Sequence, residues 1–538
     1  MNAGKGGRAR LSMVILCALL AQLACAATSS FGSRLRDGDH LVFCGDSITC
    51  HSWTRTNGCH HLVTNAIERS GVAKGVTVTG LGFCGNTVGS WLEREKVTRG
   101  PKAATELSNR HGDFFLPQDV KRTLDGKVDV VAILLGMNDI LMPAVGDSDE
   151  ARAAWARDYA RLASNLRART KARELVLGTF MPLTADPDGP KNRARADMNR
   201  RIRQIAREMN AIVWEAGPAA EATIAETRRC DPSFREAPDF VHPGDFGHLA
   251  MAAAFCRAVG EDGAAADLDG RRRELMEKRF PLKPSVSYRL YPRFLSTPTA
   301  ERLTYDLVWN VRGLRNPQVS FEVPDGWTCS PLAAHGAEGT VRIDANPNRW
   351  RNVVTIRARE GAVKVEVEVP FATPWCVSEG FDFPAAWRGM SWQTNAVPPV
   401  TADQVRWSRL LAGTWDYLGK CSSASVDLYQ ALFGSARDSV YVRRRIVSAK
   451  PRTVGFVIGT EAFSATFGFV VSLNGEDVWR GTLPRGVSRI EPQVELSLVA
   501  GSNELVIRVD HNQWQRQFSL DFTPRGGDAL SDLRFDWR

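Results

Sequence analysis

Short apolar runs alternate with amphipathic stretches through the first half of the chain, as far as residue 258. The apolar runs predict strands at 41–44, 76–80, 128–135, 174–180 and 211–214. The stretches between them predict helices, for example over 148–172 and 191–209, and residues 248–259 predict a closing helix. Strands that alternate with helices indicate a parallel sheet with helices on both faces. Five such strands predict an α/β fold, a flavodoxin-like three-layer sandwich.

The pattern changes near residue 280, where prolines become frequent. From 286 to 372 the helical period is absent, and apolar and polar positions alternate, most clearly over 363–369. Period-two alternation is typical of half-buried strands. Short strands of this kind over about 90 residues predict an immunoglobulin-like β-sandwich.

A second all-β region follows over 439–524, with Asn474-Gly475 as a strong hairpin signal between two apolar runs. It is similar to the jelly-roll, galactose-binding-like modules. The predicted domain layout is a signal peptide at 1–26, an α/β domain at 30–262, a linker at 263–285, the first sandwich at 286–374, an irregular connecting region at 375–436 and the jelly-roll domain at 437–538.

The first 26 residues have the composition of a secretory signal. Basic residues come first, an apolar run follows over 11–23, and Ala24-Cys25-Ala26 offers a small-residue cleavage site. Cys25 also allows a lipoprotein anchor, although Gln22 fits a lipobox poorly. No other stretch is long enough to span a membrane. We therefore expect a secreted or periplasmic protein without a transmembrane segment in the mature chain.

Net charge and cysteine content argue against two further classes of protein. The formal charge is +9, but three basic residues lie in the leader, and the rest are scattered rather than clustered, which argues against nucleic-acid binding. Nine of the 11 cysteines lie beyond the leader, an odd number that does not fit a disulfide scaffold. Cys50 and Cys59 are the candidate pair for a disulfide bond in an exported protein, and we expect Cys44 and Cys84 to be buried free thiols.

The clearest candidate for chemistry lies directly after the first predicted strand. Gly45-Asp46-Ser47 ends this apolar run, and a helix-compatible segment begins near Thr56. Ligands of open α/β sheets bind at the carboxyl ends of the strands, so Ser47 is a candidate nucleophile. A serine after a strand can equally cap a helix, and the hydrolase elbow G-x-S-x-G is absent.

Three later blocks accompany this serine: Gly82–Thr87, Ile133–Asp139 with its Gly-x-Asn-Asp ending, and Asp239-Phe240-Val241-His242. With the Gly-Asp-Ser block, they resemble the SGNH (GDSL) hydrolase superfamily, whose four blocks occur in this order. The resemblance covers residues 30 to 260, about half of the chain.

The resemblance implies a serine hydrolase on a flavodoxin-like fold. It assigns the nucleophile to Ser47, the general base to His242 and the carboxylate that orients the base to Asp239. It assigns the oxyanion hole to the backbone N–H groups of Ser47 and Gly85 and to the side-chain amide of Asn138. We interpret three further matching residues as structural: Asp46, Asp139 and His248.

Two other patterns point elsewhere. Gly80–Gly85 fits G-x-G-x-x-G, but a dinucleotide site places this motif after the first strand, with an acidic residue closing the next one. Cys59-His60-His61, with His51, suggests a metal, but the spacing matches no known zinc motif, and surface histidines near a site mouth are commoner. We therefore expect no cofactor and no metal.

The sequence thus predicts an exported serine esterase, and appended β domains favour O-deacetylation of a polysaccharide or glycan. Two alternatives stay open: a lipid or thioester hydrolase with the same triad, and a glycan-binding surface protein with a vestigial esterase domain. The expected partner is an acylated glycan or another ester substrate. The sequence leaves the oligomeric state open.

Overall fold

The structure is a computed structural model that describes residues 33–99, 117–141, 148–182, 190–232, 234–237, 241–292, 302–349, 352–371, 373–379, 401–405, 407–411, 425–427, 439–460, 467–483, 494–510, 517–523 and 530–537. The chain divides into two compact units, the first made of 1–223 and 240–276 and the second of 224–239 and 277–538. The predicted signal peptide, with Cys25, and most of the predicted connecting region 375–436 lie outside the described residues.

The first unit contains a parallel five-stranded sheet in the order β2-β1-β3-β4-β5. Its strands are β1 (His40–Gly45), β2 (Thr77–Gly82), β3 (Val130–Leu134), β4 (Glu174–Gly178) and β5 (Ile212–Trp214). This order is that of the flavodoxin-like doubly wound fold. The predicted α/β fold class and the five predicted strands are confirmed.

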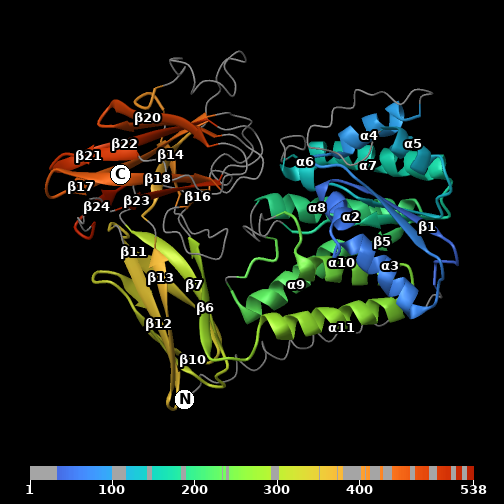
Figure 1. The fold of residues 1–538 in the computed structure, drawn as a ribbon, viewed down its shortest axis with the longest axis horizontal. Helices are drawn as coiled ribbons and strands as arrows, with labels where there is room; N and C mark the ends of the chain where they lie inside the picture. The colour runs from blue at the N-terminus through green and yellow to red at the C-terminus, as the bar shows by residue number, and fades with distance from the viewer. Residues whose placement is uncertain are drawn as a thin grey trace, which may run out of the picture. The chain divides into compact units, whose positions relative to one another are not determined.

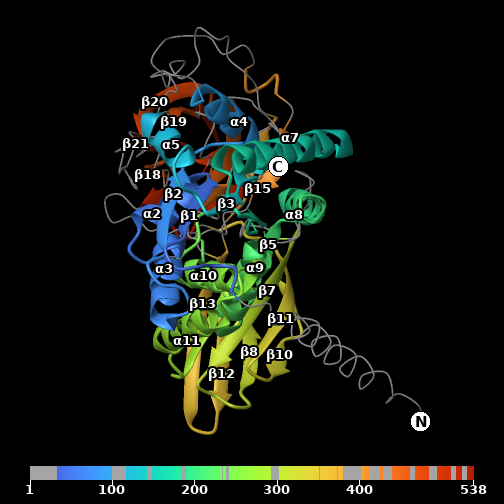
Figure 2. The same cartoon turned by 90° about the vertical axis from the view of Figure 1, so that its right-hand side faces the viewer.

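Helices cover both faces of this sheet (Figures 1 and 2). On one side α3 packs against α10, and on the other α4 and α5 pack against α7. The helices are α2 (Ser47–Thr54), α3 (Cys59–Ser70), α4 (Val88–Val97), α5 (Pro117–Leu124), α6 (Met137–Leu141), α7 (Asp149–Thr170), α8 (Pro190–Glu208), α9 (Ala216–Cys230), α10 (Asp245–Ala258) and α11 (Asp262–Arg279).

Helix α7 illustrates how the sequence directs this packing. The Ser148 side chain caps the helix by accepting a hydrogen bond from the Ala151 N–H at 3.1 Å. Trp155, Tyr159 and Leu162 are buried, and their spacing of three and four residues places them on one face of the helix. This apolar face packs toward β3, while the other faces of the helix are polar.

The sheet register places the candidate residues at one edge. Gly45, the last residue of β1, is paired with Gly82 on one side and with Leu134 on the other. Three parallel strands therefore end at the same level, and the segments that follow them begin side by side. These are the segments that carry Ser47, Gly85 and Asn138.

Two expectations from the sequence need correction. Helix α2 begins at Ser47 and not near Thr56, because the Asp46 side chain caps it and the helix follows the strand without a loop. The stretch 263–285, expected as a linker, contains most of α11. The predicted closing helix is confirmed as α10.

The second unit contains two pairs of antiparallel sheets, as expected for β-sandwiches. The first pair has the strand orders β10-β8-β12-β13 and β6-β7-β11-β9. Its strands are β6 (Ser285–Pro292), β7 (Leu303–Arg312), β8 (Gln318–Glu322), β9 (Thr328–Ser330), β10 (Ala333–His335), β11 (Glu338–Ala345), β12 (Asn352–Glu360) and β13 (Val363–Phe371). Tyr305, Trp309 and Phe371 are buried in its core.

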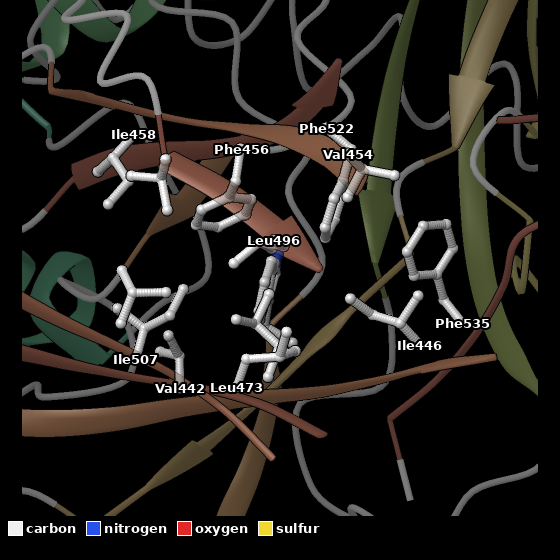
Figure 3. Close-up of a cluster of buried hydrophobic side chains, with 14 of the residues drawn as sticks. Val442, Ile446, Val454, Phe456, Ile458, Leu473, Leu496, Ile507, Phe522 and Phe535 are labelled. Carbon is white, nitrogen blue, oxygen red and sulfur yellow. The ribbon is translucent and has the colours of Figure 1, made fainter. Parts of the chain in front are cut away.

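The second pair consists of a seven-stranded sheet, β15-β14-β17-β22-β19-β20 with β24 beside β17, and a four-stranded sheet, β16-β23-β18-β21. The strands are β14 (Trp375–Ser378), β15 (Trp407–Leu411), β16 (Ser425–Asp427), β17 (Ser439–Ser448), β18 (Arg452–Thr460), β19 (Phe467–Leu473), β20 (Glu476–Leu483), β21 (Val494–Leu498), β22 (Gly501–Asp510), β23 (Gln517–Thr523) and β24 (Arg534–Asp536). Asn474 and Gly475 have φ of 53° and 86° in the hairpin between β19 and β20. Figure 3 shows the apolar core of this sandwich, with Phe456, Leu496 and Ile507 among its members.

Cysteines and helix hydropathy complete the description. None of the cysteines that the structure describes forms a disulfide bond, and this includes Cys50 and Cys59. Cys44 is buried as predicted, whereas Cys84 is only half-buried because it lies in the loop after β2. Among the described helices, none combines the length and the apolar character that a membrane crossing requires.

Candidate active site

Ser47 is the first residue of α2, immediately after the turn that ends β1. Asp46 has extended backbone, and its carboxylate accepts a hydrogen bond from the Ile48 N–H at 2.9 Å. This bond satisfies one of the unpaired N–H groups at the start of the helix. The cap therefore fixes the direction in which α2 leaves the sheet, and with it the position of Ser47.

His242 lies beside this serine, although 195 residues separate the two in sequence. Its Nε2 atom is 2.7 Å from the Ser47 hydroxyl oxygen, a distance at which the hydroxyl can donate its proton to the ring. His242 comes just before α10, which packs against α3 and thereby anchors the segment. Asp239, the predicted third member, lies outside the described residues.

The two remaining predicted residues lie in segments joined by a hydrogen bond. Asn138, in α6, donates from Nδ2 to the main-chain oxygen of Asn86 at 3.0 Å. Gly85, next to Asn86, has a φ of 74°, a left-handed conformation that glycine adopts without strain. The Phe83 N–H donates to the Gly45 oxygen at 3.1 Å, which ties this loop to the end of β1.

Comparisons with known proteins concern the same part of the chain. Residues 43–250 match the sequence profile of the GDSL-like Lipase/Acylhydrolase family. This part of the chain is a GDSL-like acylhydrolase domain. The chain is therefore an ester-hydrolysing enzyme, and the superfamily resemblance read from its four blocks is confirmed.

A characterised relative and solved structures are similar to the same region. An acetylxylan esterase from Geobacillus stearothermophilus is 25% identical over 239 residues, which are 42% of this chain and 96% of the relative. The crystal structure of Axe2, an acetylxylan esterase from Geobacillus stearothermophilus, is 22% identical, with a TM-score of 0.31 over 42% of this chain and 96% of the other. LAE5, an alpha/beta hydrolase enzyme from the metagenome of Lake Arreo in Spain, is 19% identical, with a TM-score of 0.32 over 43% and 99%.

Two buried carboxyls lie behind the serine of the acylhydrolase domain. Burial raises the pKa of Asp46 to about 6, although the Ile48 N–H and His242 favour its charged form. Burial also raises the pKa of Asp139 to about 7, although both of its oxygens lie 3.2 Å from the Val88 N–H that they accept from. Asp139 thus joins the end of β3 to the start of α4, a structural role that agrees with the interpretation made from the sequence.

Two further histidines lie near the His242 ring, and their proximity was not predicted from the sequence. The ring of His51, in α2, lies against that of His242, with 4.3 Å between the ring centroids and 38° between the planes. His248, in α10, is fully buried, and burial lowers its pKa to about 3, with further contributions from Arg55, His51 and His242. Ser47 and His51 are four residues apart on one helix, so both side chains lie on the same face. With the start of α2 predicted correctly, this spacing would have placed His51 beside His242.

The histidines of the Cys59-His60-His61 pattern have different contacts. His60 is buried, not on the surface, and stacks on Phe43 at 4.3 Å between ring centroids. His61 instead bonds from Nε2 to the main-chain oxygen of Trp53 at 2.7 Å. Within the described ranges, no group of three histidine, cysteine or acidic side chains is arranged to hold a metal ion.

Proposed function

We propose that this protein is a secreted serine esterase that removes O-acetyl groups from a polysaccharide or other glycan. The observation that carries the proposal is the 2.7 Å contact between the Ser47 hydroxyl oxygen and Nε2 of His242. A hydroxyl is a weak nucleophile by itself, and a base within hydrogen-bonding distance activates it. The domain supplies this pair at the carboxyl edge of the sheet, where ligands of such folds bind.

In the reaction, the Ser47 oxygen attacks the ester carbonyl carbon while its proton passes to Nε2 of His242. The tetrahedral intermediate then expels the sugar alkoxide, which takes the proton from His242 and leaves an acetyl-serine. Water then gives a proton to the same ring and attacks the acetyl carbon. The second tetrahedral intermediate releases acetate as its bond to the Ser47 oxygen breaks, and this oxygen takes the proton back from His242. Asp239 orients the ring and stabilises the imidazolium. The mechanism consumes only water.

The developing oxyanion needs N–H donors that are already in position. We assign them to the backbone N–H groups of Ser47 and Gly85 and to the side chain of Asn138. Two features support this assignment: Asn138 is bonded to the loop that contains Gly85, and this loop is bonded to the end of β1 next to Ser47.

The proposed substrate class, an acetyl ester of a glycan, rests on the comparisons with known proteins. The similar protein from Geobacillus stearothermophilus is an acetylxylan esterase, and the chain covers 96% of its length. The β-sandwiches that follow the catalytic domain suit a polymeric substrate. The signal peptide predicted at 1–26 suits an enzyme that meets this substrate outside the cytoplasm.

The test is acetate release from acetylated xylan and from other acetylated plant, bacterial and host glycans. Hydrolysis of p-nitrophenyl acetate is compared with that of the octanoate, and Ser47→Ala is the control. We expect Ser47-dependent acetate release and a preference for the acetyl ester. A preference for the octanoate would favour the lipid or thioester hydrolase, and no turnover of either ester would favour a glycan-binding protein.

A further inference from the structure

Helix α2 presents two side chains to the same imidazole. Ser47 begins the helix and His51 follows one turn later, so that both lie on one face. Ser47 contacts the edge of the His242 ring through Nε2, and the ring of His51 lies 4.3 Å away from it, centroid to centroid. The catalytic imidazole is therefore held between a hydroxyl and a second imidazole of the same helix.

We propose that His51 is a positioning residue that supports catalysis only while it is uncharged. Its neutral ring packs against His242 and keeps Nε2 directed at Ser47, whereas a protonated ring opposes the positive charge that His242 acquires during the reaction. The inference rests on the proposed esterase mechanism and extends it to a residue outside the triad.

The physical reason lies in the proton transfer. When Ser47 attacks, its proton moves to Nε2, and His242 becomes an imidazolium. A second positive charge about 4 Å away would raise the energy of this state, because like charges at that distance repel strongly in a partly buried site. A neutral aromatic ring in tilted contact does not carry this penalty.

Other titratable groups lie on α2 and on the elements near it. They are Asp46 and Arg55 on α2, His60 on α3, Asp139 on α6, His248 on α10 and Cys44 on β1. Burial lowers the pKa of both His60 and His248 to about 3 and raises that of the Cys44 thiol, so these three stay neutral near neutral pH.

The pKa of Asp46 is raised to about 6 and that of Asp139 to about 7. Both carboxyls therefore change charge in the range in which an ordinary histidine titrates. The shape of the acid limb alone would not identify His51, so the test compares the wild-type profile with that of variants at this position.

The experiment measures kcat and KM for p-nitrophenyl acetate between about pH 5 and pH 9. It compares the wild-type full chain with His51→Phe, which keeps an aromatic ring without a charge, and with His51→Gln, which lacks the ring. His335→Gln is the matched control, because His335 is exposed in β10 of the second unit.

At about pH 8 we expect His51→Phe to retain kcat, and His51→Gln to lose it by roughly 3- to 10-fold with little change in KM. For each protein, kcat at about pH 5 is divided by kcat at about pH 8. This ratio should be roughly threefold or more higher in each His51 variant than in the wild type, since one inactivating protonation is gone. His335→Gln should follow the wild-type profile. Thermal unfolding of each variant verifies that it is folded.

The outcomes separate the two proposals. If both His51 variants keep the wild-type rate and pH profile, the role of His51 is wrong, while the esterase proposal stands. If His51→Phe loses as much activity as His51→Gln and the acid limb does not move, His51 is only a packing residue, which also contradicts the inference. Absence of Ser47-dependent hydrolysis in the wild type would overturn the proposed function and this inference with it.

Discussion

The side-chain amide of Asn138 donates a hydrogen bond to the main-chain oxygen of Asn86, 52 residues earlier, at 3.0 Å. This bond joins the segment after β3 to the loop after β2. An amide nitrogen has two N–H groups, and using one to fix the side chain leaves the other available to a ligand. The residue thus has the property that an oxyanion donor needs, namely that it is in place before the reaction starts.

We predict that Asn138→Ala lowers kcat for p-nitrophenyl acetate by about 10²- to 10³-fold and leaves KM nearly unchanged, because this donor acts on the transition state. Asn138→Asp should be at least as damaging, since a carboxylate of the same shape offers no N–H and adds negative charge. Steady-state kinetics test both variants. Wild-type kcat in Asn138→Asp would exclude this residue from the oxyanion hole.

Substitutions of the three proposed triad residues should differ in how strongly they lower the rate. Ser47→Ala should abolish hydrolysis, and His242→Ala should lower kcat by about 10⁵- to 10⁶-fold. Asp239→Asn should cost about 10⁴-fold, since orientation of the ring is lost rather than the proton acceptor. Single-turnover kinetics resolve these differences. Equal residual activity in all three variants would show that the site is misassigned.

The sheet could be predicted from the sequence because its central strands are buried on both faces. The apolar runs of β1 and β3 are stable only in such a buried position, and the carboxyl ends of these two strands bring the Gly-Asp-Ser and Gly-x-Asn-Asp blocks together. The contact between Ser47 and His242 could be anticipated only through the resemblance to a family. The local sequence pattern of neither segment indicates a contact with a residue 195 positions away.

The start of α2 could not be predicted from the pattern, and this had a consequence for the site. The sequence indicates a structural role for Asp46 but does not indicate that its carboxylate caps a helix that begins at once. The helix places His51 against His242, whereas a loop in the same place gives no such expectation. Whether a polar residue forms a turn or a cap depends on tertiary packing, here on β2 lying against α2.

The buried carboxyl of Asp139 predicts a pH-dependent stability. Its pKa is raised to about 7, above the value near 4 of an unfolded chain. Between about pH 4 and pH 7 the folded protein holds a proton that the unfolded chain has lost, so stability falls as pH rises through this range. Asp139→Asn keeps an oxygen for the Val88 N–H but cannot ionise. It should raise the free energy of unfolding by about 1–4 kcal/mol at about pH 8 and have little effect at about pH 4.

Urea denaturation at several pH values measures this difference, and Asp125→Asn is its control. Burial opposes ionisation of Asp125, but Arg169 and Lys121 outweigh it and hold the pKa of Asp125 below its usual value. The stability that this carboxylate contributes is lost only below about pH 4, so Asp125→Asn should leave the slope between about pH 4 and pH 8 unchanged. If Asp139→Asn also leaves the slope unchanged, the carboxyl is not the group that titrates.

The close approach of β2 to α2 predicts opposite effects for two glycine substitutions in the first unit. A Cβ at Gly82 would lie 2.1 Å from the Cys50 nitrogen and 2.6 Å from its Cα, so that the backbone of α2 would have to move. A Cβ at Gly270, in α11, would meet nothing within 4 Å. Gly82→Ala should therefore destabilise the protein by about 1–3 kcal/mol, and Gly270→Ala should stabilise it by about 0.5–1 kcal/mol through helix propensity.

The two glycine substitutions also distinguish a loss of stability from a loss of catalytic rate. Because Ser47 and Cys50 share one turn of α2, a shift of the helix at Cys50 displaces the nucleophile from His242, and displacements of about 1 Å can cost about 10²-fold in rate. Gly82→Ala should thus lose kcat even at temperatures where it stays folded, and Gly270→Ala should keep the wild-type kcat. Thermal unfolding and kinetics at one temperature measure both effects. Full activity in a folded Gly82→Ala variant would mean that α2 moves without displacing Ser47, and that the strand does not position the serine.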